Sequence, residues 1–344
     1  MNSNRFSGAE NVAFQIMNLF KDDNFDMVYS SKDGQVREAL EREGIQFYPL
    51  SKVSIQQVSK VVEKFRPDII HAHDVLASVV ASFFTNQAEI VSHIHNREKM
   101  GRINLKTLLY LVRVNNLKHI FWVSNSVFDN YIFRNRVIDK SSILYNVVDV
   151  GKILAECEAD ANHYNYDVVY LGRLCYQKNP ERLINVLNKA IKIEKNLRIA
   201  IIGTGDLVGK VKGLVEGNKI RENISFLGYR NNPLKILKDA KVMLMTSKSE
   251  GTPMCALEAM ALGVPIVSTP TDGLVDIIQD KVTGYLSEDD DVLAERITSI
   301  VADKNLHEWL SNNSKIRAVD LMNTENYKNK INEIYMQCGV FEHV

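Results

Sequence analysis

The sequence predicts an α/β protein made of two doubly wound domains, each built on a parallel sheet. Strand-like and helix-like segments alternate along the chain, as in sheets that carry helices on both faces. The length of 344 residues is enough for two domains of ordinary size, each with its own core. In addition, several predicted strands end in glycine or histidine turns, where open α/β sheets bind ligands.

The composition is that of a globular enzyme and argues against a nucleic-acid partner. Hydrophobic residues make up 45% of the chain and charged residues 24%, and Lys+Arg and Asp+Glu both total 42. This balance lacks the basic excess that binds phosphate backbones. The sequence contains neither a recognisable signal peptide nor an apolar run near the roughly 20 residues of a membrane-spanning helix, so we expect a cytoplasmic protein.

No metal site is predicted. The cysteines lie far apart and form neither a CxxC pair nor a zinc set with histidines, which indicates reduced thiols. They are Cys157, Cys175, Cys255 and Cys338. The consecutive acids at 288–291 stand at a predicted helix start, where carboxylates complement the helix dipole, so capping explains them better than metal binding.

The predicted elements divide the chain into domains at 1–150 and 166–322, with a polar linker at 151–165 and a terminal helix at 323–344. Helices are expected at 36–44, 55–65 and after the turn at 124–126 in the first domain, and from near 180 and 253 in the second. Predicted strands cover 26–31, 45–50, 67–73, 89–95, 119–123, 144–149, 166–171, 197–202, 224–228, 242–246 and 265–269.

The stretch from Lys241 to Thr269 is the most informative part of the chain. It predicts strand, polar turn, helix and second strand, with Thr252 as the helix N-cap and Pro253 at the first helical position. Glu250 and Glu258 flank the helix start, whose free N–H groups favour phosphate. Hydrogen-bond acceptors around a phosphate cradle suit a nucleotide sugar, although solvated surface glutamates are the simpler interpretation of position alone.

The phrase SEGTPMCALEAMALGVPIV at 249–267 resembles the signature of the retaining glycosyltransferases of family 4. The resemblance implies the GT-B fold, in which two Rossmann-like domains face each other. It also implies that Glu250 contacts the donor sugar and Glu258 the ribose. The backbone between them would meet the diphosphate, at Gly251, Thr252, Pro253, Met254, Cys255 and Ala256.

Three further phrases of the second domain resemble the same family. GRLCYQKN at 172–179 looks like its GR…K motif, which implies that Gly172, Arg173 and Lys178 contact the donor phosphates. The GxG at 203–205 lacks the third glycine of a dinucleotide fingerprint, so the resemblance instead places Gly203 in the wall of the nucleotide pocket. The third phrase, ISFLGYRNN at 224–232, resembles the segment that borders the nucleobase, which implies that Gly228, Tyr229 and Arg230 lie beside the base.

The loop TPTDGLVDII at 269–278 looks like the GG-x-x-E loop of the family, but departs from it at two positions. Asp272 replaces one glycine and Asp276 replaces the acid, which leaves the contacts to the sugar less defined.

In the first domain, PDIIHAHD and HIHN resemble family phrases that end strands. They bring histidines to the crevice, at 71, 73, 93 and 95. The resemblance puts His95 near the donor sugar and the acceptor, with His73 a weaker candidate; a structural hydrogen-bonding role is the alternative for each. FSGAEN at 6–11 looks like the glycine loop that opens this domain, where Gly8 would approach the donor phosphate or the acceptor.

A strand normally precedes that glycine loop, and none is present before Phe6. Because this strand is central in a doubly wound sheet, its loss would expose the backbone groups of its neighbours. We expect either a truncated or misassigned start or a weak first domain. The thermal stability of the chain compared with one extended upstream tests this expectation.

The segment 97–118 is basic and interleaved with apolar residues. A basic amphipathic helix can lie on an anionic membrane surface, but a helix packed on the domain with a solvated basic face has the same pattern. The positive charges come from Arg97, Lys99, Arg102, Lys106, Arg113 and Lys118.

Together these features predict a retaining, metal-independent hexosyltransferase without a cofactor. It would move a hexose or N-acetylhexosamine from a nucleotide-diphosphate sugar to a glycan or lipid-linked acceptor hydroxyl, in cell-surface polysaccharide assembly. UDP-sugar is the first expectation and GDP-sugar the second, and location at the inner face of the plasma membrane is an alternative to the free cytoplasm. The expected catalytic residues are His95, Glu250, Arg173 and Lys178. A nucleotide-sugar epimerase of the same fold and a non-catalytic binding partner are the competing hypotheses.

Overall fold

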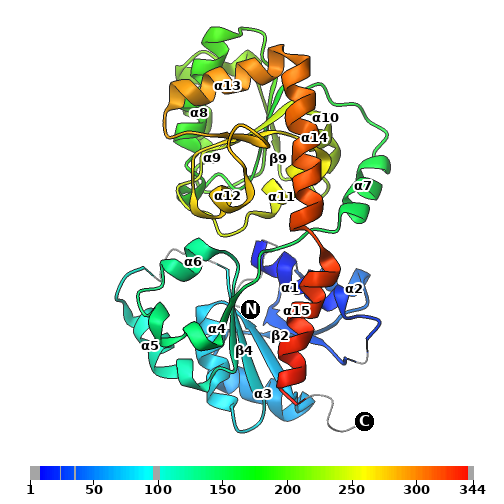
Figure 1. Ribbon diagram of the computed structural model, residues 1–344, viewed down its shortest axis with the longest axis vertical. Helices are drawn as coiled ribbons and strands as arrows, with labels where there is room; N and C mark the ends of the chain where they lie inside the picture. Colours follow the sequence, from blue (N-terminus) through cyan, green and yellow to red (C-terminus); the bar gives the residue numbers. More distant parts are fainter. Residues whose placement is uncertain (1–7, 24, 35, 96–100, 340–344) are drawn as a thin grey trace. The chain divides into compact units, whose positions relative to one another are not determined.

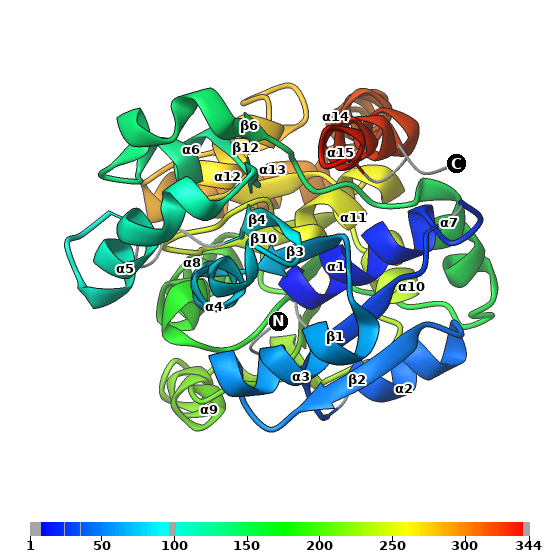
Figure 2. The same ribbon diagram turned by 90° about the horizontal axis from the view of Figure 1, so that it is seen from below.

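The computed structural model describes residues 8–23, 25–34, 36–95 and 101–339. The chain forms two compact units, seen in Figures 1 and 2. The first unit comprises Met1–Asn146 and Asn323–Val344, and the second comprises Val147–Met322. Both units are α/β with parallel strands, as predicted.

The second unit contains one six-stranded parallel sheet in the order β12-β11-β10-β7-β8-β9. The strand order reverses between β7 and β10, which makes this the topological switch point of a doubly wound sheet. β7, β8 and β10 consist of apolar residues that are almost all buried, as expected for strands covered on both faces. The strands are β7 (Val168–Leu171), β8 (Ile199–Ile202), β9 (Ile224–Gly228), β10 (Val242–Met245), β11 (Ile266–Ser268) and β12 (Gly284–Leu286).

The helices of this unit are α7 (Val150–Glu158), α8 (Pro180–Ile193), α9 (Val208–Gly217), α10 (Leu234–Asp239), α11 (Met254–Leu262), α12 (Asp272–Ile277), α13 (Asp290–Ala302) and α14 (Lys304–Leu321). One large core joins α8, α9 and α13 to the sheet. The acids at 288–291 behave as predicted: Asp289 caps α13, and Asp290 and Asp291 form ion pairs with Arg182 and Lys189 of α8.

The segment 151–165, predicted as a polar linker, begins with most of helix α7 (Val150–Glu158), which was not predicted. Asp149 caps this helix by accepting from Lys152 N at 2.9 Å, and Ile153 and Cys157 are buried on its inner side. The helix packs against α10 and α11. A helix of this length gains most of its stability from tertiary packing, so the contacts with α10 and α11 explain it.

The first unit differs from the single sheet that was expected. β1 (Val28–Lys32) pairs with β2 (Gln46–Leu50), whereas the second sheet has the order β3-β4-β5-β6. Within the described residues, β1 and β3 belong to different sheets. In the strand order of a doubly wound sheet, the first strand of the domain lies between the strands that correspond to β1 and β3. The strands of the second sheet are β3 (Ile69–His73), β4 (Glu89–Ile94), β5 (His119–Trp122) and β6 (Ser141–Ile143). β6 therefore lies upstream of the strand predicted at 144–149.

The helices of the first unit are α1 (Gly8–Leu19), α2 (Val36–Arg42), α3 (Ile55–Phe65), α4 (Val75–Ala81), α5 (Leu105–Arg113), α6 (Asn125–Asp129) and α15 (Thr324–Gln337). α15 belongs to this unit although it is last in sequence. Its Tyr335 packs against Phe20 and Phe25, and its Lys328 forms an ion pair with Asp23 at 2.8 Å. Among the described residues, no helix is both long and apolar enough to span a bilayer.

Candidate functional site

The candidate site of the second unit lies in the loops that follow β7 and β10, on either side of the switch point. A 3-10 turn, Tyr176–Lys178, joins the loop after β7 to helix α8. Gln177 connects this turn to the loop after β10 by two hydrogen bonds. Its side-chain amide donates to Ser249 O at 3.0 Å, and its backbone carbonyl accepts from Lys248 N at 2.8 Å. The two loops are thus held as one surface at the carboxyl ends of the strands.

A buried ion pair joins the same two loops. Lys178 Nζ lies 2.5 Å from Glu250 Oε1, and only 15% of the lysine side chain and 6% of the glutamate side chain are exposed. Burial alone would lower the pKa of Lys178, but the Glu250 carboxylate outweighs it and raises that pKa, so the lysine stays charged. Ser247 Oγ donates to the same Oε1 atom. In the described part of the chain these hydrogen bonds end on Oε1, which leaves Oε2 to accept from a substrate hydroxyl.

Helix α11 begins beside Glu250 without a side-chain cap. Its first residue is Met254, and Pro253 holds the capping position with φ −73° and ψ 120°. The prediction that Thr252 caps the helix is therefore wrong by one residue, because the extended conformation of Pro253 already precedes the first helical turn. Since no side chain occupies the first N–H groups of α11, they can donate to an anion such as phosphate.

Glu258 lies one turn into α11 and is partly buried. Burial raises the pKa of its carboxyl to about 7, and Glu156 of α7 adds a smaller like-charge effect. The structure shows no cation paired with this carboxyl within the described residues. Near neutral pH the group is therefore poised between a carboxylate and a carboxylic acid.

We predict that Glu258 makes the unliganded protein less stable as pH rises. Its folded pKa of about 7 exceeds the ordinary glutamate value of 4.5, so its stabilising contribution is full below pH 4.5 and is lost as pH rises through 7. The loss between pH 5 and pH 8 is expected to be on the order of 2–3 kcal/mol, because each pKa unit corresponds to about 1.4 kcal/mol and part of the shift from 4.5 to about 7 takes effect below pH 5. Chemical denaturation of wild type and Glu258→Gln between pH 5 and 8 measures the effect.

The Glu258→Gln variant should lose this slope and exceed wild type in stability at pH 8. Glu295→Gln, on an exposed position of α13, is the matched control and should keep the wild-type slope. An unchanged slope in Glu258→Gln would contradict the prediction.

The glycines at the strand ends pack loops against each other. A Cβ on Gly203, where φ is +130°, would lie 2.0 Å from Gly172 O. A Cβ on Gly205 would lie 2.3 Å from Leu174 O, and Leu174 N donates to Thr204 O at 2.9 Å. This GxG therefore brings the loops after β7 and β8 together, which explains the pair of glycines without a dinucleotide fingerprint.

The loop after β11 closes on the Glu250 loop. Gly273 N donates to Glu250 O at 3.4 Å, and a Cβ on Gly273 would stand 1.1 Å from Gly251 O. The replacement of one family glycine by Asp272 therefore does not affect Gly273, which is the glycine that this close approach requires. Asp272 itself begins α12, so this substitution is compatible with the loop fold.

The other predicted donor residues lie along the same edge. Arg173 follows β7 and is exposed, and Gly228 ends β9 with φ +66°, followed by exposed Tyr229 and Arg230. Cys255 is in the first turn of α11, where burial raises the pKa of its thiol to about 12. This cysteine is therefore protonated and unsuited to act as a nucleophile.

In the first unit, the sheet places His95 just beyond β4. His95 Nε2 lies 2.9 Å from His73 Nδ1, and burial lowers the pKa of His95 to about 3. The imidazole is therefore neutral and can donate or accept a hydrogen bond. Gly8, expected in a loop, is instead the first residue of helix α1 and is exposed. The structure describes this unit by itself, so the approach of His95 to Glu250 stays a prediction.

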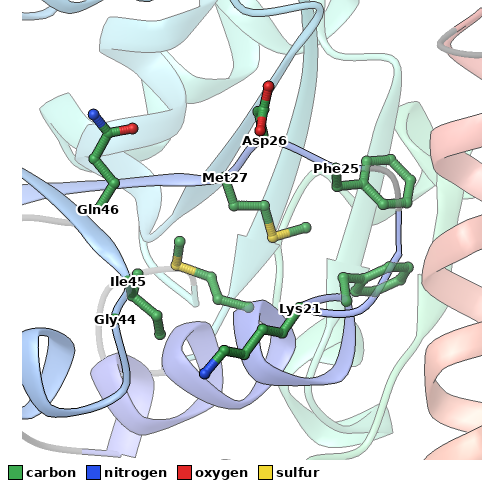
Figure 3. Close-up of a pocket in the computed structure, with 9 residues that line it drawn as sticks. Lys21, Phe25, Asp26, Met27, Gly44, Ile45 and Gln46 are labelled. Atoms are coloured by element: carbon green, nitrogen blue, oxygen red, sulfur yellow. The ribbon is translucent and has the colours of Figure 1, made fainter.

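A pocket of about 230 Å³ in the first unit is not part of this arrangement. It is lined by the end of α1 and by the residues that lead into β1 and β2, among them Lys21, Asp26 and Gln46 (Figure 3). It therefore opens at the amino ends of the strands, opposite the edge where doubly wound sheets bind ligands.

Sequence reasoning missed two features of the site. Ser247 and Gln177 position the Glu250 loop, but isolated polar residues in loops carry no recognisable signal. The stacking of histidines in β3 and β4 was also missed, although the i, i+2 spacing of HAH and HIH predicts that each pair shares one face of a strand.

Comparison with known families agrees with this geometry. The model of Glycosyl transferases group 1 matches residues 158–317, and that of Glycosyltransferase Family 4 matches residues 6–152. The chain is a family 4 glycosyltransferase. The match to group 1 includes the loops that follow β7, β8, β9, β10 and β11. The candidate site of the glycosyltransferase therefore lies within the region that this family model matches.

Individual relatives support the same assignment. The glycosyltransferase is 27% identical over 80% of its length to an uncharacterized glycosyltransferase of Methanocaldococcus jannaschii, of which 76% is covered. It is 26% identical over 67% of its length to the capsular polysaccharide biosynthesis glycosyltransferase CapH of Staphylococcus aureus, of which 68% is covered. Among solved structures, Anabaena HepE in complex with UDP-glucose matches with a TM-score of 0.86 at 18% identity and covers 98% of each chain. This last match establishes the GT-B fold class.

Proposed function

We propose that this glycosyltransferase is a retaining hexosyltransferase that takes its sugar from a UDP-sugar. The transferred group would be a hexose or an N-acetylhexosamine, and the acceptor a glycan or lipid-linked hydroxyl in surface polysaccharide assembly. The second unit would bind the nucleotide sugar and the first unit the acceptor. The Lys178–Glu250 pair beside the uncapped start of α11 is the observation that carries the proposal.

The donor fits the chemistry of the site. Glu250 Oε2 can accept from a sugar hydroxyl, because Lys178 and Ser247 hold the other oxygen in place. The Glu258 carboxyl can accept from the ribose diol. HepE forms a complex with UDP-glucose, and the name of CapH places that enzyme in capsular polysaccharide biosynthesis, which favours UDP over GDP donors.

The residues also support departure of the nucleotide without a metal ion. Negative charge develops on the diphosphate as the glycosidic bond breaks, and donors that are already oriented stabilise it most effectively. The first N–H groups of α11 and the cations of Arg173 and Lys178 are such donors. No metal-binding DxD loop is evident in the sequence at a strand end.

A front-face route suits the retention that the family resemblance implies. The leaving phosphate would help to take the proton of the acceptor hydroxyl, since both stand on the same side of the sugar. His95 would then hold the sugar or the acceptor as a neutral hydrogen-bonding group.

The direct test is a screen of radiolabelled UDP- and GDP-sugars, with analysis of the product and measurement of thermal protection. We expect protection by UDP and a labelled glycoside with the anomeric configuration of the donor. An isomerised nucleotide sugar would identify an epimerase, and absence of nucleotide binding would identify a non-catalytic partner; either result overturns the proposal. If sugar transfer required an added divalent metal, the proposal that the nucleotide departs without a metal ion would be overturned.

We also propose peripheral contact of helix α5 with an anionic membrane. Apolar side chains of α5 and the residue before its cap face solvent, at Ile103, Leu105, Leu108, Leu109 and Val112. Arg102, Lys106 and Lys118 are exposed near them, whereas Arg113 is engaged by Ser82. Exposed apolar groups beside cations match the interface of an anionic bilayer. Arg97 and Lys99, which were predicted as part of this surface, lie outside the described residues.

Vesicle flotation tests this contact. The wild-type protein should float with vesicles that contain anionic lipid and much less with neutral ones. Leu105→Glu/Val112→Glu should reduce the bound fraction by about tenfold or more, because two apolar groups leave the interface and two negative charges enter. Val275→Glu, an exposed apolar position in α12 of the second unit, is the matched control and should bind as wild type. Equal flotation of wild type and double variant would contradict the proposal.

A further inference from the structure

The first unit contains a row of stacked imidazoles on β3 and β4. His73 and His93 face each other in the parallel register, and His71 precedes His73 by two residues on the same face. Ring centroids lie 4.5 Å apart for His71 and His73, 5.1 Å for His73 and His93, and 5.4 Å for His71 and His93. His95 extends the row, 4.3 Å from His93. A contact to one sugar hydroxyl would require only one histidine, whereas this row contains four.

Several nitrogens of the row lack a hydrogen-bond partner. His93 is fully buried, and neither its Nδ1 nor its Nε2 is bonded to any residue that the structure describes. His71 Nε2 is likewise buried without a partner among the described residues. Buried polar groups are nearly always satisfied, so each of these atoms indicates a missing ligand.

The free nitrogens are close enough to converge on one ion. One ring nitrogen from each of His71, His73 and His93 lies within 4.8 Å of the other two. In a tetrahedral zinc site with bonds of about 2.0–2.1 Å, two ligand nitrogens are about 3.3 Å apart. The three rings are nearly parallel, with interplanar angles of 25°, 12° and 29°, so they must rotate about their side-chain torsions before their nitrogens point to one ion.

Neighbouring side chains already orient two of the three rings. Tyr335 Oη of α15 lies 2.7 Å from His71 Nδ1, so His71 presents Nε2 to the site. His95 Nε2 lies 2.9 Å from His73 Nδ1, so His73 also presents Nε2. A hydrogen bond on the second ring nitrogen is what fixes the tautomer and direction of metal-bound histidines.

We propose that His71, His73 and His93 bind a divalent zinc-type ion in the first unit. Three imidazoles suit zinc and its neighbours in the transition series and exclude Mg²⁺ and Ca²⁺, which prefer oxygen ligands. The fourth position is open. The ion links β3 to β4 and, through Tyr335, to α15. The proposal does not depend on the proposed transfer reaction.

The experiment uses the full chain after removal of metal with a chelator. Calorimetric titration with Zn²⁺ should give one site for each chain, and Co²⁺ should produce the visible absorption of a tetrahedral nitrogen site. His93→Phe, which keeps a ring in the stack, should weaken Zn²⁺ binding by more than about 100-fold. Tyr335→Phe removes only the orienting hydroxyl and should weaken it by about 10–100-fold.

His163→Gln controls for surface binding, because this histidine is exposed in the second unit and should leave the affinity unchanged. Absence of stoichiometric binding and of the Co²⁺ spectrum in wild type would overturn the proposal without any variant. Wild-type affinity in a folded His93→Phe or in Tyr335→Phe would also overturn it. Should His93→Phe fail to fold, Tyr335→Phe and the wild-type spectrum decide. These readouts are independent of sugar transfer.

Discussion

Lys178→Met is expected to slow sugar transfer strongly and to destabilise the second unit by about 3 kcal/mol, because it leaves the buried Glu250 carboxylate without its cation. The loss in kcat should be about 10²–10³-fold, the usual effect of removing a group that stabilises charge in the transition state. Denaturant unfolding and transfer kinetics measure the two effects separately. Both effects follow from one residue, because the cation that holds Glu250 also acts electrostatically on Cys255 in the first turn of α11.

A second substitution separates stability from function. Lys178→Met/Glu250→Gln removes both charges, so we expect it to regain most of the lost stability while kcat stays as low as in Lys178→Met. Lys235→Met is the matched control: it breaks the Lys235–Asp239 pair of α10, also at 2.5 Å and also largely buried. That variant should lose stability but keep kcat. Recovery of transfer in the double variant, or an equal loss of kcat in Lys235→Met, would contradict the assigned role of the pair.

Gly273→Ala is expected to be among the most damaging small substitutions in the chain. The added methyl group would overlap Gly251 O, a backbone atom that cannot move without displacing the Glu250 loop. We expect a loss of about 3 kcal/mol, or roughly 6–12 °C in the unfolding midpoint of a unit of this size. Donor binding should weaken at the same time, because the overlap acts directly on the residues that would hold the sugar.

Gly213→Ala in α9 provides the comparison. No atom lies within 4 Å of a Cβ at this position, and the residue is in a helix interior, where alanine is favoured over glycine by about 0.5–1 kcal/mol. This variant should be as stable as wild type or more so, with unchanged nucleotide affinity. A Gly273→Ala protein that unfolds and binds UDP like Gly213→Ala would show that the two loops do not meet as the structure has them.

Much of the fold could be predicted because its signals are local. The predicted helix at 55–65 is observed with the same bounds, and Asp289 caps α13, with Asp290 and Asp291 in its first turn, as expected from the place of these acids before an apolar run. The phrase at 249–267 identified the family because it combines a polar turn, a helix start and two glutamates in one continuous stretch. Helix α7 was missed because its stability comes from packing against α10 and α11.

The sequence by itself determined the α/β class and the family, and it supplied the prediction of which residues face a nucleotide sugar, since periodicity and contiguous motifs carry that information. Only the tertiary structure decided what those residues do to each other. Lys178 and Glu250 are 72 positions apart and neutralise each other in a buried pair, while Glu258 lacks a cation among the described residues and has a raised pKa. The division between β1 and β3 and the meeting of four histidines on one sheet face likewise depend on strand order and register. Charge state, burial and strand pairing are properties of neighbours in space, and no local pattern encodes them.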